Sequence, residues 1–253
     1  MIHLNLLKTN ASATMSKIEQ SSKASENLQT LNGISPQSCT KEVLERAPNL
    51  KKLGIRGKLV VLLDDNNRLF DNLAKLGYLV KLKLQNDVCL NPPSRCQLRG
   101  LPPSFKFPPK LKSLTLSYTF LDWGHISILG MLENLEVLKL KDNAFMGDCW
   151  EVGRTHFRRL EFLHIGHTNL VTWVALGHHF PELRCLELHN CDELREIPIG
   201  LADAPYFRAL DLCHSKLAVA SAKKIQKAKE KKKEDHNDEF NYGFKLSIFP
   251  PEE

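Results

Sequence analysis

The spacing Leu-x-x-Leu-x-Leu recurs at an almost constant interval through this 253-residue sequence. The five clearest copies are Leu111-Leu114-Leu116, Leu135-Leu138-Leu140, Leu160-Leu163-Ile165, Leu183-Leu186-Leu188 and Phe207-Leu210-Leu212. Their first positions lie 24, 25, 23 and 24 residues apart. A period of this length, with one short strand and one return segment per copy, predicts a solenoid in which each repeat stacks on its neighbours.

After each strand the five copies continue with a small polar residue or a cysteine followed by an apolar residue. These pairs are Thr119-x-Leu121, Asn143-x-Phe145, Thr168-x-Leu170, Cys191-x-x-Leu194 and Ser215-x-Leu217. At this position the chain leaves the strand, and a hydrogen-bonding side chain satisfies nearby backbone groups. The pattern predicts a leucine-rich repeat solenoid of the α/β class. Its curved parallel sheet lies on the concave side, with irregular segments and short helices on the convex side.

The N-terminal half carries weaker copies, which bring the total to about eight. They are Leu28-x-x-Leu31-x-x-Ile34, Leu50-Leu53-Ile55 and Leu79-Leu82-Leu84. Residues 40–47 predict one or two helical turns capped by Thr40. A helical spacing follows at Leu69, Phe70, Leu73 and Leu76. Three proline pairs between residues 84 and 111 forbid regular helix there, so we expect an irregular loop.

We therefore expect three regions in the chain. Residues 1–27 are polar and lack periodicity, which predicts a disordered leader. Residues 28–217 form the solenoid, and residues 218–253 form a C-terminal cap. In the cap, Ala218, Ala222, Ile225 and Lys229 follow a helical period, which predicts an amphipathic helix with its lysines outward. A charged segment and a last short strand, with Phe244, Leu246 and Ile248 alternating, complete the cap at the C-terminal edge.

The cysteine content indicates a reducing compartment, and the positive charge is concentrated in one segment of the chain. Seven cysteines without regular spacing argue against a disulfide framework, so we expect a cytoplasmic protein, with nuclear or peripheral membrane association as alternatives. No apolar stretch is long enough to span a membrane.

Of the net charge of +6, residues 222–235 contribute 7 lysines − 3 acidic residues = +4. We interpret this lysine run as a solvated face of the cap and expect no nucleic-acid partner; a nuclear-import signal or membrane-surface patch is the alternative.

The residues between the core leucines point outward and form rows about 4.8 Å apart across neighbouring repeats. The middle row reads Gly54, Lys83, Thr115, Lys139, His164, Glu187 and Asp211. One flanking row reads Lys52, Lys81, Ser113, Val137, Phe162, Cys185 and Ala209, and the other Arg56, Gln85, Ser117, Lys141, Gly166, His189 and Cys213. Within these rows we predict a concave protein-binding surface made of Lys81, Lys83, Lys139, Lys141, Phe162, His164, Glu187, His189 and Asp211.

Two other kinds of chemistry are disfavoured. His164, Glu187, His189, Asp211 and Cys213 could approach closely enough to hold zinc, but neighbouring parallel strands rarely arrange ligands tetrahedrally. We therefore expect separate, solvated side chains, no metal and no cofactor. The sequence has neither Gly-x-x-x-x-Gly-Lys-Ser/Thr nor Gly-x-Gly-x-x-Gly, so we expect no nucleotide site, and no closed catalytic pocket. Trp123, Trp150 and Trp173 fall in return segments, where packing is favoured over an exposed binding role.

Several longer stretches resemble the leucine-rich region of plant intracellular immune receptors. The resemblance is to the coiled-coil nucleotide-binding (NB-ARC) class, and within it to the solanaceous late-blight-resistance type. It covers roughly residues 28–253. The stretches include residues 28–36 (LQTLNGISP), 48–57 (PNLKKLGIRG), 143–150 (NAFMGDCW), 164–170 (HIGHTNL), 178–183 (HHFPEL), 194–201 (LREIPIGL), 221–226 (SAKKIQ) and 244–251 (FKLSIFPP).

The resemblance implies a sensing and autoinhibitory domain of plant defence. Its partners would be a pathogen effector or a guarded host protein, and the nucleotide-binding module of a related full-length receptor. The coiled coil and the nucleotide-binding module of that family have no counterpart in this sequence, so we expect the rear part of a larger receptor. Two alternatives stay open: a substrate-recruiting adaptor for a ubiquitin ligase, and a non-functional receptor fragment.

Overall fold

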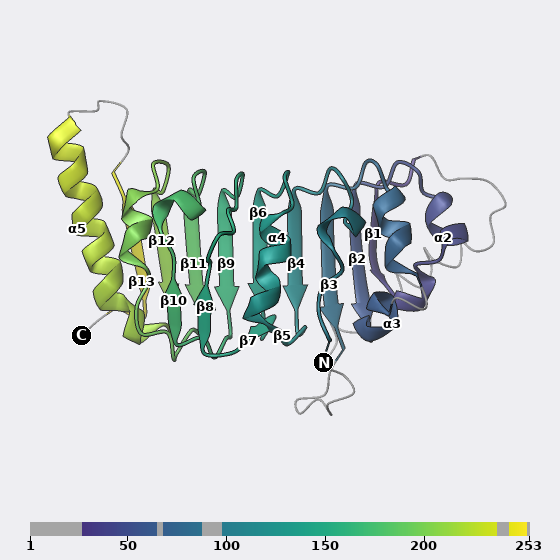
Figure 1. The fold of residues 1–253 in the computed structure, drawn as a ribbon, viewed down its shortest axis with the longest axis horizontal. Coiled ribbons are helices and arrows are strands. Elements are labelled where there is room, and N and C mark those ends of the chain that lie inside the picture. Colours follow the sequence, from purple (N-terminus) through teal and green to yellow (C-terminus); the bar gives the residue numbers. More distant parts are fainter. Residues whose placement is uncertain (1–26, 65–67, 88–97, 237–242, 252–253) are drawn as a thin grey trace. The chain divides into compact units, whose positions relative to one another are not determined.

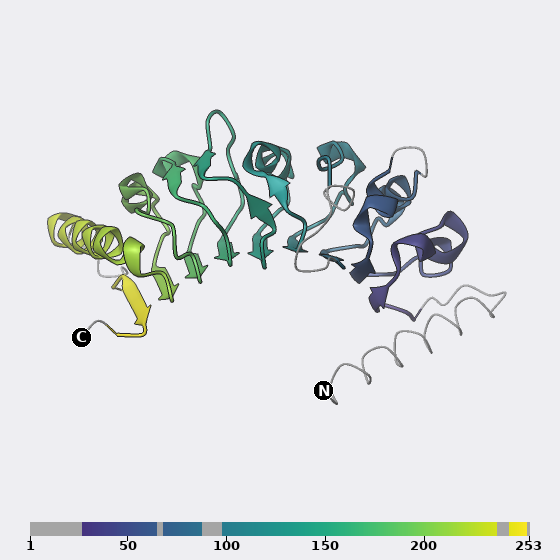
Figure 2. The same cartoon turned by 90° about the horizontal axis from the view of Figure 1, so that it is seen from below.

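The computed structural model describes residues 27–64, 68–87, 98–236 and 243–251. The predicted leader lies outside this part of the chain, apart from Asn27. The chain packs as two compact units, Met1–Thr119 (unit 1) and Phe120–Glu253 (unit 2). In each unit the parallel strands form one layer and the return segments form a second layer behind them (Figure 1, Figure 2).

Unit 1 contains four parallel strands that pair in chain order. They are β1 (Thr30–Ile34), β2 (Lys52–Gly57), β3 (Lys81–Asn86) and β4 (Ser113–Ser117). Leu53, Leu82 and Leu114 are register partners, and all three are buried. The leucine spacing therefore gave the correct register. The return segments contain η1 (Pro36–Ser38), α2 (Lys41–Glu45), α3 (Leu59–Leu63), η2 (Phe70–Lys75) and η4 (Ser104–Lys106).

The local predictions for unit 1 are confirmed with one refinement. Thr40 caps α2, because its hydroxyl accepts a hydrogen bond from the Val43 N–H at 3.4 Å. The predicted helical spacing around Phe70 is a 3-10 helix, η2, and its buried Phe70 packs edge-on against Phe107 with 5.1 Å between ring centroids. In the described part of the proline-rich interval, η4 is a single turn.

Unit 2 repeats the arrangement with five parallel strands. They are β6 (Val137–Lys141), β9 (Phe162–Gly166), β11 (Cys185–His189), β12 (Ala209–Cys213) and β13 (Lys245–Phe249). The pairing of β13 with β12 confirms the predicted last strand at the C-terminal edge. Its return segments carry two small parallel sheets, β5 (Leu121–Asp122) with β7 (Phe145–Met146) and β8 (Cys149–Glu151) with β10 (Thr172–Val174). They also contain η5 (Trp123–His125), α4 (Ile126–Gly130), η6 (Gly177–His179), η7 (Ile199–Asp203) and η8 (Lys216–Ala218).

A left-handed residue turns the chain out of its strand in successive repeats of unit 2. His167, Asn190 and His214 have φ of 50°, 53° and 49°. The side chain that follows bonds inside the turn, as predicted. The buried Ser215 hydroxyl accepts from the Cys191 N–H at 3.2 Å and lies 3.2 Å from the Leu188 carbonyl oxygen. These side chains thus satisfy the backbone of the preceding repeat.

The three tryptophans form a buried stack among the return segments of unit 2. The rings of Trp123 and Trp150 lie 5.0 Å apart and 12° from parallel, and those of Trp150 and Trp173 lie 4.7 Å apart and 6° from parallel. Each side chain is at most 4% exposed. The expected packing role is confirmed.

The C-terminal helix α5 (Val219–His236) covers the last return segment, with Ala222 and Ile225 fully buried. The expectation that its lysines point outward is wrong for Lys229. Its ammonium donates to the Ala204 carbonyl oxygen at 2.5 Å, and burial lowers its pKa to about 8. Lys232 remains exposed but pairs with Asp203 of η7. Two lysines of the run therefore attach the helix to the preceding repeat.

Ser215→Ala should lower the stability of unit 2. The substitution leaves the buried Cys191 N–H without its acceptor, which costs about 1–3 kcal/mol and lowers the thermal midpoint by roughly 2–10 °C. Ser127→Ala is the control, because the Ser127 hydroxyl donates only a solvent-exposed hydrogen bond to the Gly124 carbonyl oxygen, and it should change the midpoint much less than Ser215→Ala. Equal midpoints for both variants in calorimetry would show that the turn hydroxyl contributes nothing.

Candidate binding surface

The side of the strands opposite the return segments is called the strand face. In unit 1 the register aligns Lys52 with Lys81 and Gly54 with Lys83. Lys52, Lys81 and Lys83 are all exposed. Gly54 adds no side chain beside Lys83. The strand face of unit 1 therefore presents a positively charged patch that includes two predicted binding residues.

Strand β6 of unit 2 contributes Lys139 and Lys141, both half-buried. The Lys139 ammonium lies 4.8 Å from the centre of the Phe162 ring on β9, a cation–π contact. Lys139 and Phe162 therefore pack against each other on the surface, and a partner would contact them together.

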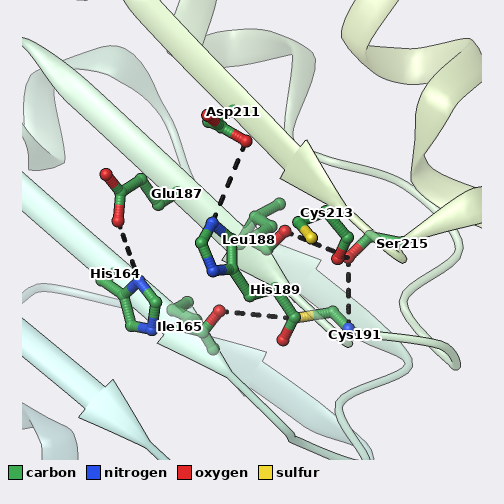
Figure 3. A network of polar contacts seen from close by, with 9 residues as sticks. All are labelled: His164, Ile165, Glu187, Leu188, His189, Cys191, Asp211, Cys213 and Ser215. Atoms are coloured by element: carbon green, nitrogen blue, oxygen red, sulfur yellow. Dashed lines mark hydrogen bonds and ion pairs between the residues drawn. The ribbon is translucent and has the colours of Figure 1, made fainter. Parts of the chain in front are cut away.

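The next three strands bring four predicted residues together. His164 Nδ1 lies 3.0 Å from Glu187 Oε2, and His189 Nε2 lies 3.9 Å from Asp211 Oδ1 (Figure 3). The rings of His164 and His189 are 4.8 Å apart between centroids, at 75° to each other. One ligand atom from each of His164, Glu187 and His189 lies within 4.8 Å of the other two. These three residues are the His–Glu–His cluster.

The expectation of separate side chains is wrong for His164, Glu187 and His189, and the expectation of a solvated side chain is wrong for His164. His164 lies on the strand face as predicted, but it is only 7% exposed. Its ring lies over Gly166, where an added Cβ would come within 2.9 Å of His164 Nε2. Burial lowers the pKa of His164, and the charges of His189 and Lys141 act in the same direction, while the hydrogen bond with Glu187 opposes the shift. His164 is therefore neutral near pH 7.

A second group of histidines, which was not predicted from the sequence, lies among the return segments. The rings of His178 and His179 lie 4.3 Å apart, and His156 lies 5.5 Å and 5.6 Å from them. His179 is buried, and its Nδ1 accepts from the Leu176 N–H at 3.0 Å. A signal was present in the sequence, because His156 and His178 lie 178 − 156 = 22 residues apart, close to one repeat.

No protein-family model matches the chain. Its curated relatives are plant resistance proteins. The late blight resistance protein homolog R1B-13 of Solanum demissum is 38% identical over 144 residues, which are 55% of this chain and 12% of that protein. Another late blight resistance protein homolog of the same species is 31% identical over 211 residues, which are 81% of this chain and 15% of that protein. The chain is a leucine-rich repeat region of the plant disease-resistance type.

The similarity of this resistance-type repeat region extends beyond Solanum. Disease resistance protein RPH8A of Arabidopsis thaliana is 31% identical over 106 residues, or 42% of this chain and 12% of that protein. The chain thus spans only 12% to 15% of the length of these three relatives. Among solved structures, a leucine-rich repeat protein of Leptospira interrogans has 18% identity and a TM-score of 0.43, covering 75% of this chain and 50% of that one. Within the described residues, no helix has the length and apolar composition needed to cross a bilayer.

The stability of the repeat region should fall as the pH is lowered from about 7.5 to about 5. Burial lowers the pKa of His179 below its ordinary 6.5, and the charges of His178 and His156 lower it further. The unfolded chain then takes up a proton more readily than the folded chain, so the stability supplied by neutral His179 is complete above pH 6.5 and is lost below it.

Thermal midpoints measured across this pH range test whether His179 causes the loss of stability at low pH. His179→Gln should flatten the pH dependence, whereas His125→Gln, at a half-exposed histidine outside the group, should leave it as in the unmodified chain. An unaltered slope in His179→Gln would remove His179 as its source.

Proposed function

We propose that this repeat region is a non-catalytic protein-binding module of plant innate immunity that acts through its strand face. The observation that carries the proposal is the register, which aligns outward side chains from successive strands into rows within each unit. Similarity to resistance proteins supports the defence role. An aligned surface of this kind gives many weak contacts instead of one deep pocket, which suits a protein partner.

The two units would contribute different chemistry to binding. In unit 1 the lysines favour an acidic surface on the partner, because opposite charges speed encounter and fix orientation. Unit 2 adds the Lys139–Phe162 pair and the side chains of Glu187, His189 and Asp211. A pathogen effector or a guarded host protein is the proposed partner. The nucleotide-binding module of a related full-length receptor is a further proposed partner.

A reducing compartment is the proposed location. Cys39, Cys149, Cys185, Cys191 and Cys213 are free thiols, and they are all the cysteines in the described residues. Burial raises the pKa of Cys39 and Cys191 to about 12, so these two thiols stay protonated and unreactive. Free thiols are typical of cytoplasmic proteins.

Reversing two charges on the strand face should weaken partner binding without unfolding the chain. We expect Lys81→Glu with Lys83→Glu to lower the recovery of bound proteins from infected leaf tissue roughly tenfold, because the exposed ammonium groups meet an acidic partner. The tagged chain is used to capture proteins, which are then quantified by mass spectrometry. Thermal midpoints should be unchanged because both side chains are exposed.

The matched control reverses two exposed charges on helix α5, Lys224→Glu with Lys227→Glu. This variant should capture the same proteins as the unmodified chain. Equal capture by the strand-face variant and the control would contradict the use of the Lys81–Lys83 surface. Recovery of a ubiquitin-ligase core with every variant would favour an adaptor, and recovery of no specific protein would favour a non-functional fragment.

A further inference from the structure

The His–Glu–His cluster has the composition and placement of a metal site. His164 lies on β9, and its register partner Glu187 lies on β11. His189 lies two residues further along β11, so its side chain projects from the same face. Figure 3 shows the Glu187 carboxylate and the His189 ring on the side of His164 that carries Nδ1. One ligand atom of each residue lies within 4.8 Å of the other two.

Packing holds His164 in place before any ligand arrives. The side chain is 7% exposed, and its Nε2 lies over the bare backbone of Gly166. A side chain at Gly166 would occupy the space of this ring, since an ideal Cβ would come within 2.9 Å of Nε2. The glycine therefore permits a ring orientation in which Nδ1 faces Glu187. A buried, oriented imidazole loses little freedom on binding, which favours a specific site.

A second carboxylate supports His189 from the neighbouring strand. Asp211 Oδ1 lies 3.9 Å from His189 Nε2, which leaves His189 Nδ1 on the other side of the ring (Figure 3). Metal-binding imidazoles commonly have a carboxylate beside the nitrogen that does not bind the ion, and this carboxylate sets the orientation of the ring. Asp211 therefore has a positioning role beside the cluster.

We propose that His164, Glu187 and His189 bind one Zn²⁺ ion on the strand face, with water in the remaining coordination position. Two imidazoles and one carboxylate are a ligand set that zinc accepts, whereas Ca²⁺ and Mg²⁺ take oxygen ligands. Zinc bonds of about 2.1 Å place tetrahedral ligand atoms about 3.4 Å apart, so the ligands must draw together. Glu187 and His189 are half-buried and have room to turn. When the ion is bound, the proton of neutral His164 lies on Nε2, so that Nδ1 offers its lone pair to the ion in place of the hydrogen bond with Glu187.

One nearby charge opposes the ion. Lys141 on β6 acts electrostatically on His164, and its positive charge disfavours a cation at the cluster. Neutralising Lys141 should therefore tighten zinc binding. If Lys141 served only to hold the structure together, its neutralisation would leave the zinc affinity unchanged. A tighter affinity would show that its charge repels the ion.

Zinc titration of the full chain tests the site. Metal-free protein, kept reduced, is titrated with Zn²⁺ in competition with a chromophoric chelator, and we expect one ion per chain. Glu187→Gln keeps side-chain size and His189→Asn keeps a polar side chain, and each should weaken binding at least about tenfold. Gly166→Ala should weaken it to a similar extent by displacing His164. Lys141→Gln should strengthen it. Circular dichroism of each metal-free variant checks that it is folded.

The matched control removes two exposed histidines from the return segments, His156→Asn with His178→Asn. This variant should retain the bound ion. Loss of zinc in the control but not in the cluster variants would overturn the proposal, as would absence of saturable one-to-one binding. Substitution with Co²⁺ supplies a second readout. A thiolate charge-transfer absorption would place the ion on cysteine and would also overturn the proposal, whereas its absence together with visible cobalt bands supports the nitrogen–oxygen ligand set.

Discussion

The main-chain hydrogen bonds between successive parallel strands fix the positions of the outward side chains within each unit. In unit 2, β9, β11 and β12 each have a partner on both sides, so their backbone groups are satisfied by the repeats before and after them. A shift by one residue would exchange the buried and exposed faces of a strand. The leucines that stack behind the strands prevent such a shift. Because the register is locked, side chains from distant parts of the sequence meet at fixed positions on the strand face.

The register and the rows of outward side chains could be predicted from the sequence because they depend on one repeated spacing. Leu163, Leu186 and Leu210 lie 23 and 24 residues apart, and each is a register partner of the next, so counting residues was sufficient to align them. The turn side chains were predictable for the same reason, since Cys191 and Ser215 follow their strands at equivalent positions.

The burial of His164 and Lys229 could not be predicted from the same spacing. The alternation of side chains along a strand predicts which residues point inward and which point outward. It does not predict how far neighbouring side chains bury an outward residue. His164 is buried because Gly166 makes room for its ring, and two residues on the adjacent strand stand beside it. Lys229 lies on the apolar stripe of α5, where its stem packs inward and its ammonium reaches the Ala204 carbonyl oxygen. The burial of each side chain depends on which residues surround it, so the residue type at that one position does not predict it.

The tryptophan stack gives the two units different optical properties. Trp123, Trp150 and Trp173 are the three tryptophans of the chain, and all belong to unit 2. Indole emission therefore reports the state of unit 2 alone, and loss of structure in unit 1 passes unseen by that probe. Parallel indoles 4.7 Å and 5.0 Å apart also couple as excitons. Near-ultraviolet dichroism of the chain is thus a signature of correctly stacked repeats in unit 2, distinct from its strand content.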